Sequence, residues 1–370
     1  MHLYVHVPFC ARRCSYCDFA IAVRKRIPAQ EYVDCVRREL ALRAPGAEAL
    51  DTLYLGGGTP SLLGPEALAL LLAELVRAFG LSHGGEPPEV TIEANPEDVT
   101  PEAAAGWRGA GVNRVSLGTQ SFDDTVLRWM HRVHDAARNG AAVRTLRAAG
   151  FENISLDLIF ALPQALDRDW SRDLECALAL EPAHLSLYGL TVEDRTPLAR
   201  WISRGAIAAP DDERYAEEYL LAHERLGAAG YRFYEVSNAA RDARWSRHNA
   251  AYWSGRAYLG LGPAAHSYDG RARRWNVAQW EEYRRALGQG TLPVAAEEHL
   301  SAAERELEHR YLALRTERGI GVTDIAPERL ARWVERGWGR LVGDRVRCTA
   351  EGWLRLDALV GDLTELPATV

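Results

Sequence analysis

The sequence has no long apolar run and no excess of positive charge. No uninterrupted apolar stretch reaches the roughly 18 residues that a membrane span needs. Its 44 basic residues are outnumbered by 51 acidic ones, for a formal net charge of -7. Proteins that bind nucleic acid or anionic membranes usually carry a basic footprint. We therefore expect no transmembrane segment and no nucleic-acid partner.

Targeting features and disulfide-forming cysteines are also scarce. The first residues, MHLYVHVPFC, alternate like a strand and show neither a basic n-region nor an apolar h-region, so we expect no signal peptide and a cytoplasmic protein. The 370 residues include only six cysteines. In the cytoplasm such cysteines are expected to be thiols or metal ligands rather than disulfides.

Short apolar runs alternate with longer amphipathic ones. The patterns predict strands near 3–7, 52–55, 90–94, 114–117, 154–160 and 185–188, and helices that include 32–40, 65–79 and 213–226. This β/α repetition predicts an α/β fold with a parallel sheet or barrel. In such barrels, chemistry collects at the carboxyl ends of the strands.

The alternation of strand and helix patterns changes twice along the chain. We expect the barrel to span residues 1–230 and an irregular connecting region to span 231–298. Residues 299–370 predict helices at 304–315, 327–334 and 353–359 and a hairpin at 341–346, a pattern typical of a small winged-helix-like α+β domain. Basic and acidic residues nearly balance in this domain, which favours an interaction or lid role over DNA binding.

Three cysteines share one loop with the spacing C-x3-C-x2-C: Cys10, Cys14 and Cys17. Soft thiolates select zinc or iron-sulfur clusters. A structural zinc site normally has four ligands, so zinc would need His6 or another histidine to complete it. A 4Fe-4S cluster held by three cysteines instead leaves one iron open, and the ligand count favours this interpretation.

Polar residues follow the other predicted strands. Thr91, Glu93 and Asn95 share one face of their strand by alternation, and a polar face inside a barrel needs a ligand or a network. The residues that follow the strands are Gly56 to Thr59, Glu93 with Asn95, Gln120, Asp157 and Tyr188.

The loop Cys10-Ala-Arg-Arg-Cys14-Ser-Tyr-Cys17 resembles the motif of the radical SAM superfamily, whose members fold as a partial (β/α)6 barrel. The resemblance implies that S-adenosylmethionine (SAM) chelates the open iron of a 4Fe-4S cluster and that the reduced cluster can cleave it to a 5'-deoxyadenosyl radical. Glycines after a strand let backbone approach the methionyl end of SAM closely. The resemblance places these residues around SAM: Tyr4, Tyr16, Gly57, Gly58, Thr59, Glu93, Gln120, Arg132 and Asp157.

Stretches 3–10, 91–96, 120–122 and 156–163 resemble one branch, the oxygen-independent coproporphyrinogen III oxidases and their relatives. The oxidases have a fourth cysteine where this chain has Phe19. They also have an N-terminal extension, whereas this sequence starts almost on its first predicted strand. Both differences make the chain resemble the related radical SAM haem chaperones more than the oxidases. His248-Asn-Ala-Ala-Tyr252-Trp253 matches the H-N-x-x-Y-W motif of those chaperones, which implies haem binding by His248, Tyr252 and Trp253.

A neutral imidazole is a common axial ligand of haem iron, and flat aromatic rings suit a macrocycle. His266 and Tyr268 could serve in place of His248, which could also be a buried structural histidine. The resemblance implies transfer of haem to an acceptor, such as a respiratory enzyme subunit. The alternatives are an enzyme that decarboxylates porphyrinogen propionates and a zinc-stapled interaction protein. Aromatic residues from Trp245 to Trp253 could serve a homodimer.

Overall fold

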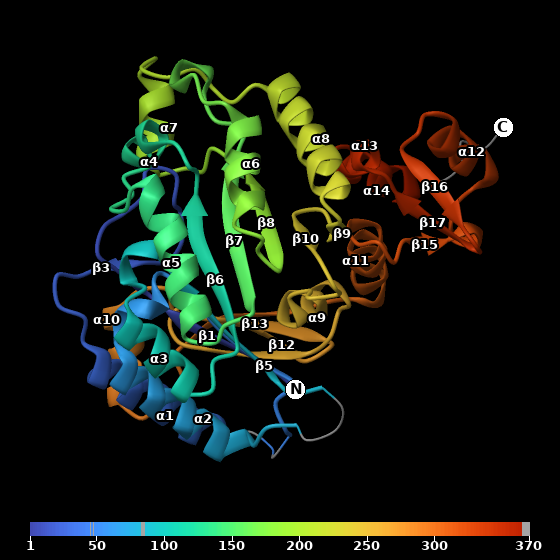
Figure 1. Cartoon of the computed structure of the whole chain (residues 1–370). Helices are drawn as coiled ribbons and strands as arrows, with labels where there is room; N and C mark the ends of the chain where they lie inside the picture. The colour runs from blue at the N-terminus through green and yellow to red at the C-terminus, as the bar shows by residue number, and fades with distance from the viewer. Residues whose placement is uncertain (45, 47, 83–85, 365–370) are drawn as a thin grey trace.

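The computed structural model describes residues 1–44, 46, 48–82 and 86–364. It is built on a sheet of twelve strands in the order β14-β13-β12-β11-β1-β4-β5-β6-β7-β8-β10-β9 (Figure 1). The six strands from β1 to β8 in this order are mutually parallel, and β11 pairs with β1 in parallel as well. Antiparallel strands extend the sheet beyond β11 and beyond β8. The predicted partial barrel of six β/α units is confirmed.

Each of the six predicted strands lies where its apolar run predicted it. In β1, Leu3, Val5 and Val7 are fully buried, while Tyr4 and His6 alternate with them and face the other side of the sheet. The strands are β1 (His2–Val7), β4 (Thr52–Gly57), β5 (Glu89–Ala94), β6 (Arg114–Gln120), β7 (Asn153–Phe160) and β8 (His184–Gly189).

Amphipathic helices cover the apolar side of these strands. Leu68, Leu71, Leu72 and Leu75 recur at helical spacing and are all buried, which ties their helix to the sheet. Several helices begin at a side-chain cap, for example that of Thr100. The helices are α1 (Ala29–Arg43), α2 (Pro65–Phe79), α3 (Pro101–Gly109), α5 (Ala136–Ala148), α6 (Trp170–Ala179) and α8 (Asp212–Ala228).

The stretch 231–298 is more regular than its sequence pattern indicated. It supplies six of the twelve strands, and most of them are only three to five residues long. Such short runs, rich in Arg and Trp, show no period of their own, so pairing with their neighbours defines them. The elements are β9 (Arg232–Glu235), β10 (Asn238–Ala240), α9 (Arg247–Trp253), β11 (Tyr258–Leu261), β12 (His266–Tyr268), β13 (Ala272–Asn276), α10 (Trp280–Gly288) and β14 (Val294–His299).

Helix α9 lies at the amino ends of β4 and β5, opposite the cysteine loop. The Glu89 carboxylate accepts hydrogen bonds from the backbone N–H groups of Arg247 and His248, both at 3.0 Å. A carboxylate at a helix N-terminus satisfies donors that otherwise lack partners. The first turn of α9 is therefore fixed to β5.

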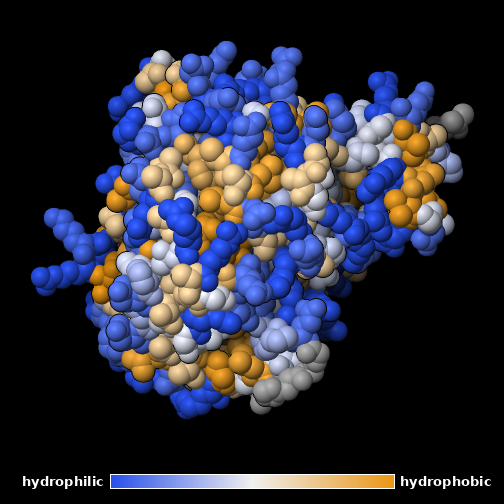
Figure 2. Space-filling model, in the orientation of Figure 1, coloured by the Kyte–Doolittle hydropathy of each residue, from blue (hydrophilic) through white to orange (hydrophobic). Residues whose placement is uncertain are grey.

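The C-terminal part forms a small separate sheet with helices around it, at the right of Figure 1. The hairpin and the first two helices expected there are present, whereas the helix expected at 353–359 is divided in two by a turn at 354–355. Trp333 is fully buried in this part. The elements are α11 (Ala302–Arg315), β15 (Ile320–Gly321), α12 (Pro327–Glu335), β16 (Gly339–Val342), β17 (Arg345–Cys348), α13 (Ala350–Trp353) and α14 (Leu356–Thr364). Figure 2 shows apolar side chains at the surface of this part, where Val334, Leu341 and Val342 are exposed.

Candidate functional site

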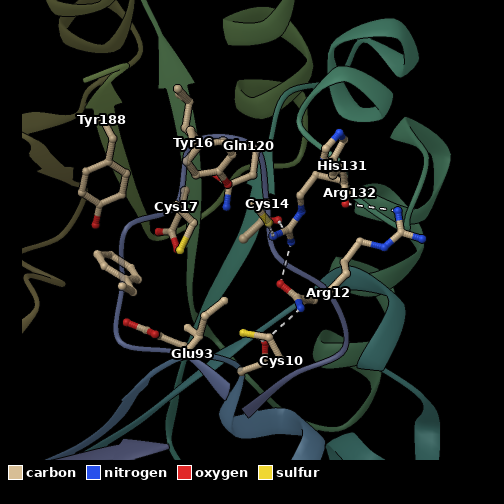
Figure 3. A pocket seen from close by; sticks show the side chains of 18 of the residues that line it. Cys10, Arg12, Cys14, Tyr16, Cys17, Glu93, Gln120, His131, Arg132 and Tyr188 are labelled. Carbon is tan, nitrogen blue, oxygen red and sulfur yellow. Dashed lines mark hydrogen bonds between the residues drawn. The ribbon is translucent and has the colours of Figure 1, made fainter. Parts of the chain in front are cut away.

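The three loop cysteines line one cavity at the carboxyl ends of the parallel strands. Cys10 ends β2 (Phe9–Cys10), and Cys14 and Cys17 lie on the loop that follows. The cavity has a volume of about 390 Å³, within the range typical of ligand sites. Figure 3 shows the three sulfurs turned toward this space, which we call the cysteine pocket. The loop motif and the strand ends thus meet in one place.

Burial raises the pKa of the Cys10 thiol and raises that of Cys17 to about 11. Neighbouring donors nevertheless point at the sulfurs. Thr59 Oγ1 donates to Cys10 Sγ at 3.5 Å, and Arg132 Nη1 donates to Cys14 Sγ at 3.8 Å. Cationic iron would offset the cost of burying thiolates, and such donors stabilise cluster-bound sulfur. The residues present therefore fit a cluster.

The geometry does not favour a single zinc ion. Within the described ranges, no three His, Cys, Asp or Glu side chains are close enough together to hold one metal ion. A cluster spreads its ligands over separate irons and does not need that closeness. His6, the fourth ligand that zinc would need, is turned away: its Nε2 lies 3.0 Å from the carbonyl oxygen of Ala20 and its Nδ1 lies 3.2 Å from the Tyr4 hydroxyl.

The glycine run after β4 lies against the cysteine loop. A Cβ atom on Gly58 would come within 2.7 Å of the Phe9 carbonyl oxygen, so only glycine fits there. Gly57 has a φ of +108° and its N–H donates to Glu93 Oε2 at 3.1 Å. The glycine run therefore lies in close backbone contact with the start of the cysteine loop.

Two half-buried carboxyl groups, Glu93 of β5 and Asp157 of β7, face the pocket. Tyr54 donates to Glu93 Oε1 at 2.9 Å, and Ser116 donates to Asp157 Oδ1 at 3.0 Å. Burial raises the pKa of Glu93 to about 7 and that of Asp157 to about 6. Carboxyl groups in this setting gain from hydroxyl donors of a ligand, such as those of a ribose.

Arg132 supplies the positive charge of the pocket. Its Nη2 donates to Asn95 Oδ1 at 2.6 Å and to the Gly118 carbonyl oxygen at 2.8 Å. Its Nε is buried and has no hydrogen-bond partner among the described residues. A buried donor without a partner fits an anionic ligand such as a carboxylate. Gln120 lies beside it with a φ of 62°, a strained conformation found at the edges of functional sites.

The structure brings eight of the nine expected SAM residues together around the cysteine pocket. Tyr4 is the exception, because it points to a different cavity. Sequence reasoning did not single out His131, whose carbonyl oxygen accepts a hydrogen bond from Arg12 at 3.3 Å. The exposed ring of Phe19 also lines the pocket. The residues that meet there are Tyr16, Gly57, Gly58, Thr59, Glu93, Gln120, Arg132 and Asp157.

A second cavity, of about 420 Å³, lies where β1, β11, β12, β13, the end of α9 and α11 meet. Aromatic side chains dominate its lining, and two of them, Tyr252 and Trp253, belong to the H-N-x-x-Y-W motif. The other lining residues are Tyr4, His6, Gly255, Arg256, Tyr258, Ala264, His266, Tyr268, Arg273, Glu308 and Leu312. We call this space the aromatic cavity.

His248 does not line either cavity. It is 1% exposed, its Nδ1 lies 2.7 Å from Thr52 Oγ1, and its Nε2 lies 2.8 Å from the Tyr252 hydroxyl. Burial lowers the pKa of His248 to about 3, so the ring is neutral. Tyr252 and Trp253 thus lie where a macrocycle could contact them, whereas both nitrogens of His248 are already engaged.

A line of contacts connects the two cavities through the barrel interior. The Tyr54 ring stacks on His248 with centroids 5.1 Å apart, and its hydroxyl bonds Glu93 in the cysteine pocket. At the other end, His248 contacts Tyr252 of the aromatic cavity. We call this series the Tyr54–His248 relay.

The aromatic residues expected at the surface for a homodimer are only partly exposed. Trp245 stacks on Tyr234 at 5.2 Å, and Arg315 lies over the Trp253 ring at 4.2 Å. These rings therefore pack within the chain. Across the described residues, no helix is long and apolar enough to cross a membrane.

Comparison with known proteins adds to this geometry. The family model of the Radical SAM superfamily matches residues 4–177. The chain is 41% identical to the "Heme chaperone HemW" of Mycobacterium tuberculosis (strain CDC 1551 / Oshkosh), with 98% of this chain and 94% of that protein covered. The protein of the same name from Bacillus subtilis is 34% identical, with 86% and 84% covered. A bovine protein, "Radical S-adenosyl methionine domain-containing protein 1, mitochondrial", is 33% identical, with 97% and 86% covered.

Among solved structures, coproporphyrinogen III oxidase (HemN) from Escherichia coli superposes with a TM-score of 0.81, covering 98% of this chain and 89% of that one. The two sequences are 22% identical. This likeness shows a shared fold.

Proposed function

This chain belongs to the radical SAM superfamily and, within it, to the family of the heme chaperone HemW, and from that premise we propose that it binds haem and passes it to an acceptor protein. The observation that carries the proposal is the 41% identity to a heme chaperone HemW, which extends over 98% of the chain. Membership of the superfamily implies a 4Fe-4S cluster and SAM as cofactors.

The cysteine pocket is the place for both cofactors. Cys10, Cys14 and Cys17 would hold the cluster, and Arg132 would bind the SAM carboxylate through its unpartnered Nε. Glu93 and Asp157 would accept hydrogen bonds from the ribose hydroxyls. A cluster held there would supply electron transfer to the bound SAM. The surrounding side chains orient the ligand and exclude water.

We propose that the occupancy of the cysteine pocket controls haem transfer. The Tyr54–His248 relay supports this role, because it joins Glu93 of the pocket to Tyr252 of the aromatic cavity. A ligand on Glu93 would compete for the hydrogen bond from Tyr54, and a shift of the Tyr54 ring would alter its contact with His248. Occupancy of the pocket would thereby alter how haem is held.

The acceptor is a cytoplasm-facing haem protein, such as a respiratory enzyme subunit. The C-terminal part, as described over residues 299–364, would dock it, since Val334, Leu341 and Val342 expose apolar area there. A homodimer is a further arrangement that this surface would allow. Analytical ultracentrifugation of the holoprotein measures the oligomeric state.

The proposed function is tested with protein that has been anaerobically reconstituted with iron, sulfide and SAM. We expect it to bind about one haem per chain, to release that haem to an apo-haem protein, and to leave coproporphyrinogen III unchanged. Phe19, in the place of the oxidases' fourth cysteine, is the reason to expect no decarboxylation. Conversion of coproporphyrinogen III to protoporphyrinogen IX, or the absence of haem binding, would overturn the proposal.

A further inference from the structure

The lining of the aromatic cavity has the chemistry of a site for a flat, anionic macrocycle. The rings of Tyr252 and Tyr258 meet edge to face with centroids 4.5 Å apart, and Tyr268 lies 6.3 Å from Tyr258. Faces and edges of this kind contact a planar conjugated ligand well. The volume of about 420 Å³ also lies in the range of cofactor sites.

Of the three histidines that the described ranges place in or beside this cavity, one, His266, has ring nitrogens without a hydrogen bond. Hydrogen bonds occupy both ring nitrogens of His6 and of His248. In the part of the chain that the structure describes, the ring of His266 has no hydrogen-bond partner. It is exposed and lines the cavity. An iron ligand needs an imidazole nitrogen with a free lone pair, and His266 alone provides one here.

The ring of His266 is held in a fixed orientation. It stacks on Trp275 of the paired strand β13, with centroids 5.6 Å apart and an interplanar angle of 19°. His266 and Tyr268 alternate with buried Ser267 on β12, so both point to the cavity side. Partial desolvation at the cavity wall and the nearby charge of Arg273 lower the pKa of His266, which favours the neutral imidazole.

The cavity also carries a positive charge that no acidic side chain among the described residues pairs with. Arg273 pairs with Glu308 and lies 3.8 Å from Glu298. The side chain of Arg256, by contrast, makes no hydrogen bond or ion pair to any residue placed in the structure, although it lines the same cavity. A guanidinium without a partner is suited to a carboxylate, and haem carries two propionates.

We propose that haem binds in the aromatic cavity, with His266 as the iron ligand and Arg256 on a propionate. His248 is then a positioning residue: it lies four positions before Tyr252 on α9 and hydrogen-bonds the Tyr252 hydroxyl, which fixes one wall of the cavity. The inference rests on the proposed function, because it names the site at which a haem chaperone would hold its cargo.

The test uses the full-length reconstituted protein and two probes, hemin and metal-free protoporphyrin IX. Both have the macrocycle and propionates, but only hemin has iron to ligate. His266→Ala is expected to raise the Kd for hemin at least tenfold and to shift its Soret band, with protoporphyrin IX binding unchanged. Added imidazole should restore the Soret band. His299→Ala, at an exposed histidine of β14, is the matched control and should change neither probe.

Two further variants separate the roles. Arg256→Gln should raise the Kd for hemin and for protoporphyrin IX by a similar factor. Arg271→Gln, at an exposed arginine outside the cavity, should change neither Kd. His248→Ala should weaken both probes but leave the Soret position of bound hemin unchanged. The inference is wrong if His266→Ala keeps the wild-type Soret position and hemin affinity, or if His248→Ala loses iron ligation. Either result would leave the proposed function standing. If the wild-type protein binds neither probe, the proposed function fails with it.

Discussion

For His248, the sequence motif and the structural surroundings point to different roles. The sequence pattern places it in a haem motif, and only the structure reveals that its nitrogens are occupied by Thr52 and Tyr252. One of these hydrogen-bond partners, Thr52, lies on a strand 196 positions earlier in the chain, and no local sequence pattern predicts that contact. By contrast, the three thiols were predictable, because their spacing on one loop is itself the signal.

The cysteines also allow a direct prediction. Replacing Cys17 with serine removes one of three thiolates, so we expect the reconstituted protein to lose most of its roughly four iron atoms per chain. Iron and sulfide analysis after anaerobic reconstitution measures this. Cys35→Ser is the matched control, since Cys35 is buried against the sheet on α1 and should leave the iron content unchanged. Full iron content in Cys17→Ser would contradict the cluster assignment.

Glu93 should make the cofactor-free protein less stable as the pH rises. Burial raises its folded pKa from 4.5 to about 7, so the folded state holds its proton more tightly than the unfolded state does. Its contribution is full below about pH 4.5 and is lost as the pH rises through about 7. Glu93→Gln, which cannot ionise, should remove a cost of roughly 3 kcal/mol or less at pH 8.

The measurement is the free energy of unfolding in urea at pH 5 and pH 8, without cofactors. The difference between the two pH values should shrink in Glu93→Gln. Glu224→Gln, at an exposed position of α8, is the control and should keep the wild-type difference. An undiminished pH dependence in Glu93→Gln would show that Glu93 ionises normally in the fold.

At the scale of elements, prediction succeeded where a pattern was long enough to have a period. The apolar residues of 65–79 repeat as a helix does, and α2 has the predicted bounds. The strands β10 and β12 have three residues each, too few for alternation to stand out. They become strands through pairing with β8 and β13, so the aromatic cavity that β12 helps to build could not be foreseen.

The contact between the end of β4 and the cysteine loop should be sensitive to a single methyl group. Gly58→Ala places a Cβ against backbone atoms of Pro8 and Phe9, which cannot move as a side chain can. We expect a loss of about 1–3 kcal/mol in stability and a lower iron content after reconstitution. Urea unfolding and iron analysis measure the two effects.

Gly109→Ala is the matched control, because a Cβ there meets no atom within 4 Å and the residue ends helix α3. Alanine is the better helix former, so this variant should be neutral or slightly stabilised. If Gly58→Ala matched Gly109→Ala in stability and in iron content, the cysteine loop would tolerate displacement from the end of β4.

At the scale of the whole molecule, one arginine joins the C-terminal part to the large sheet. Arg315 of α11 lies 2.9 Å from the Glu235 carboxylate of β9, which is fully buried, and its guanidinium covers the Trp253 ring. The backbone is tied at the same place, where the Val236 N–H donates to the Arg315 carbonyl oxygen at 3.2 Å. The contact couples α11 to the motif helix α9.

Removing this arginine should destabilise the whole chain. Arg315→Ala leaves the Glu235 carboxylate buried without its cation, and we expect a loss of about 3 kcal/mol in the free energy of unfolding by urea. Arg310→Ala, one turn earlier on the same helix, breaks only an exposed pair with Glu306 and should cost less than about 1 kcal/mol. Similar losses in the two variants would show that the buried pair does not hold the parts together.

The stacking of Trp275 on His266 has an optical consequence. Trp275 and Trp253 both lie at the aromatic cavity or against its lining, and the emission of an indole overlaps the absorption of a porphyrin. Porphyrin bound in that cavity would quench the fluorescence of these two indoles by energy transfer. The intrinsic tryptophan fluorescence should therefore fall when porphyrin binds and rise when it leaves, so stopped-flow fluorescence can measure the rate of haem transfer to an acceptor without an added dye.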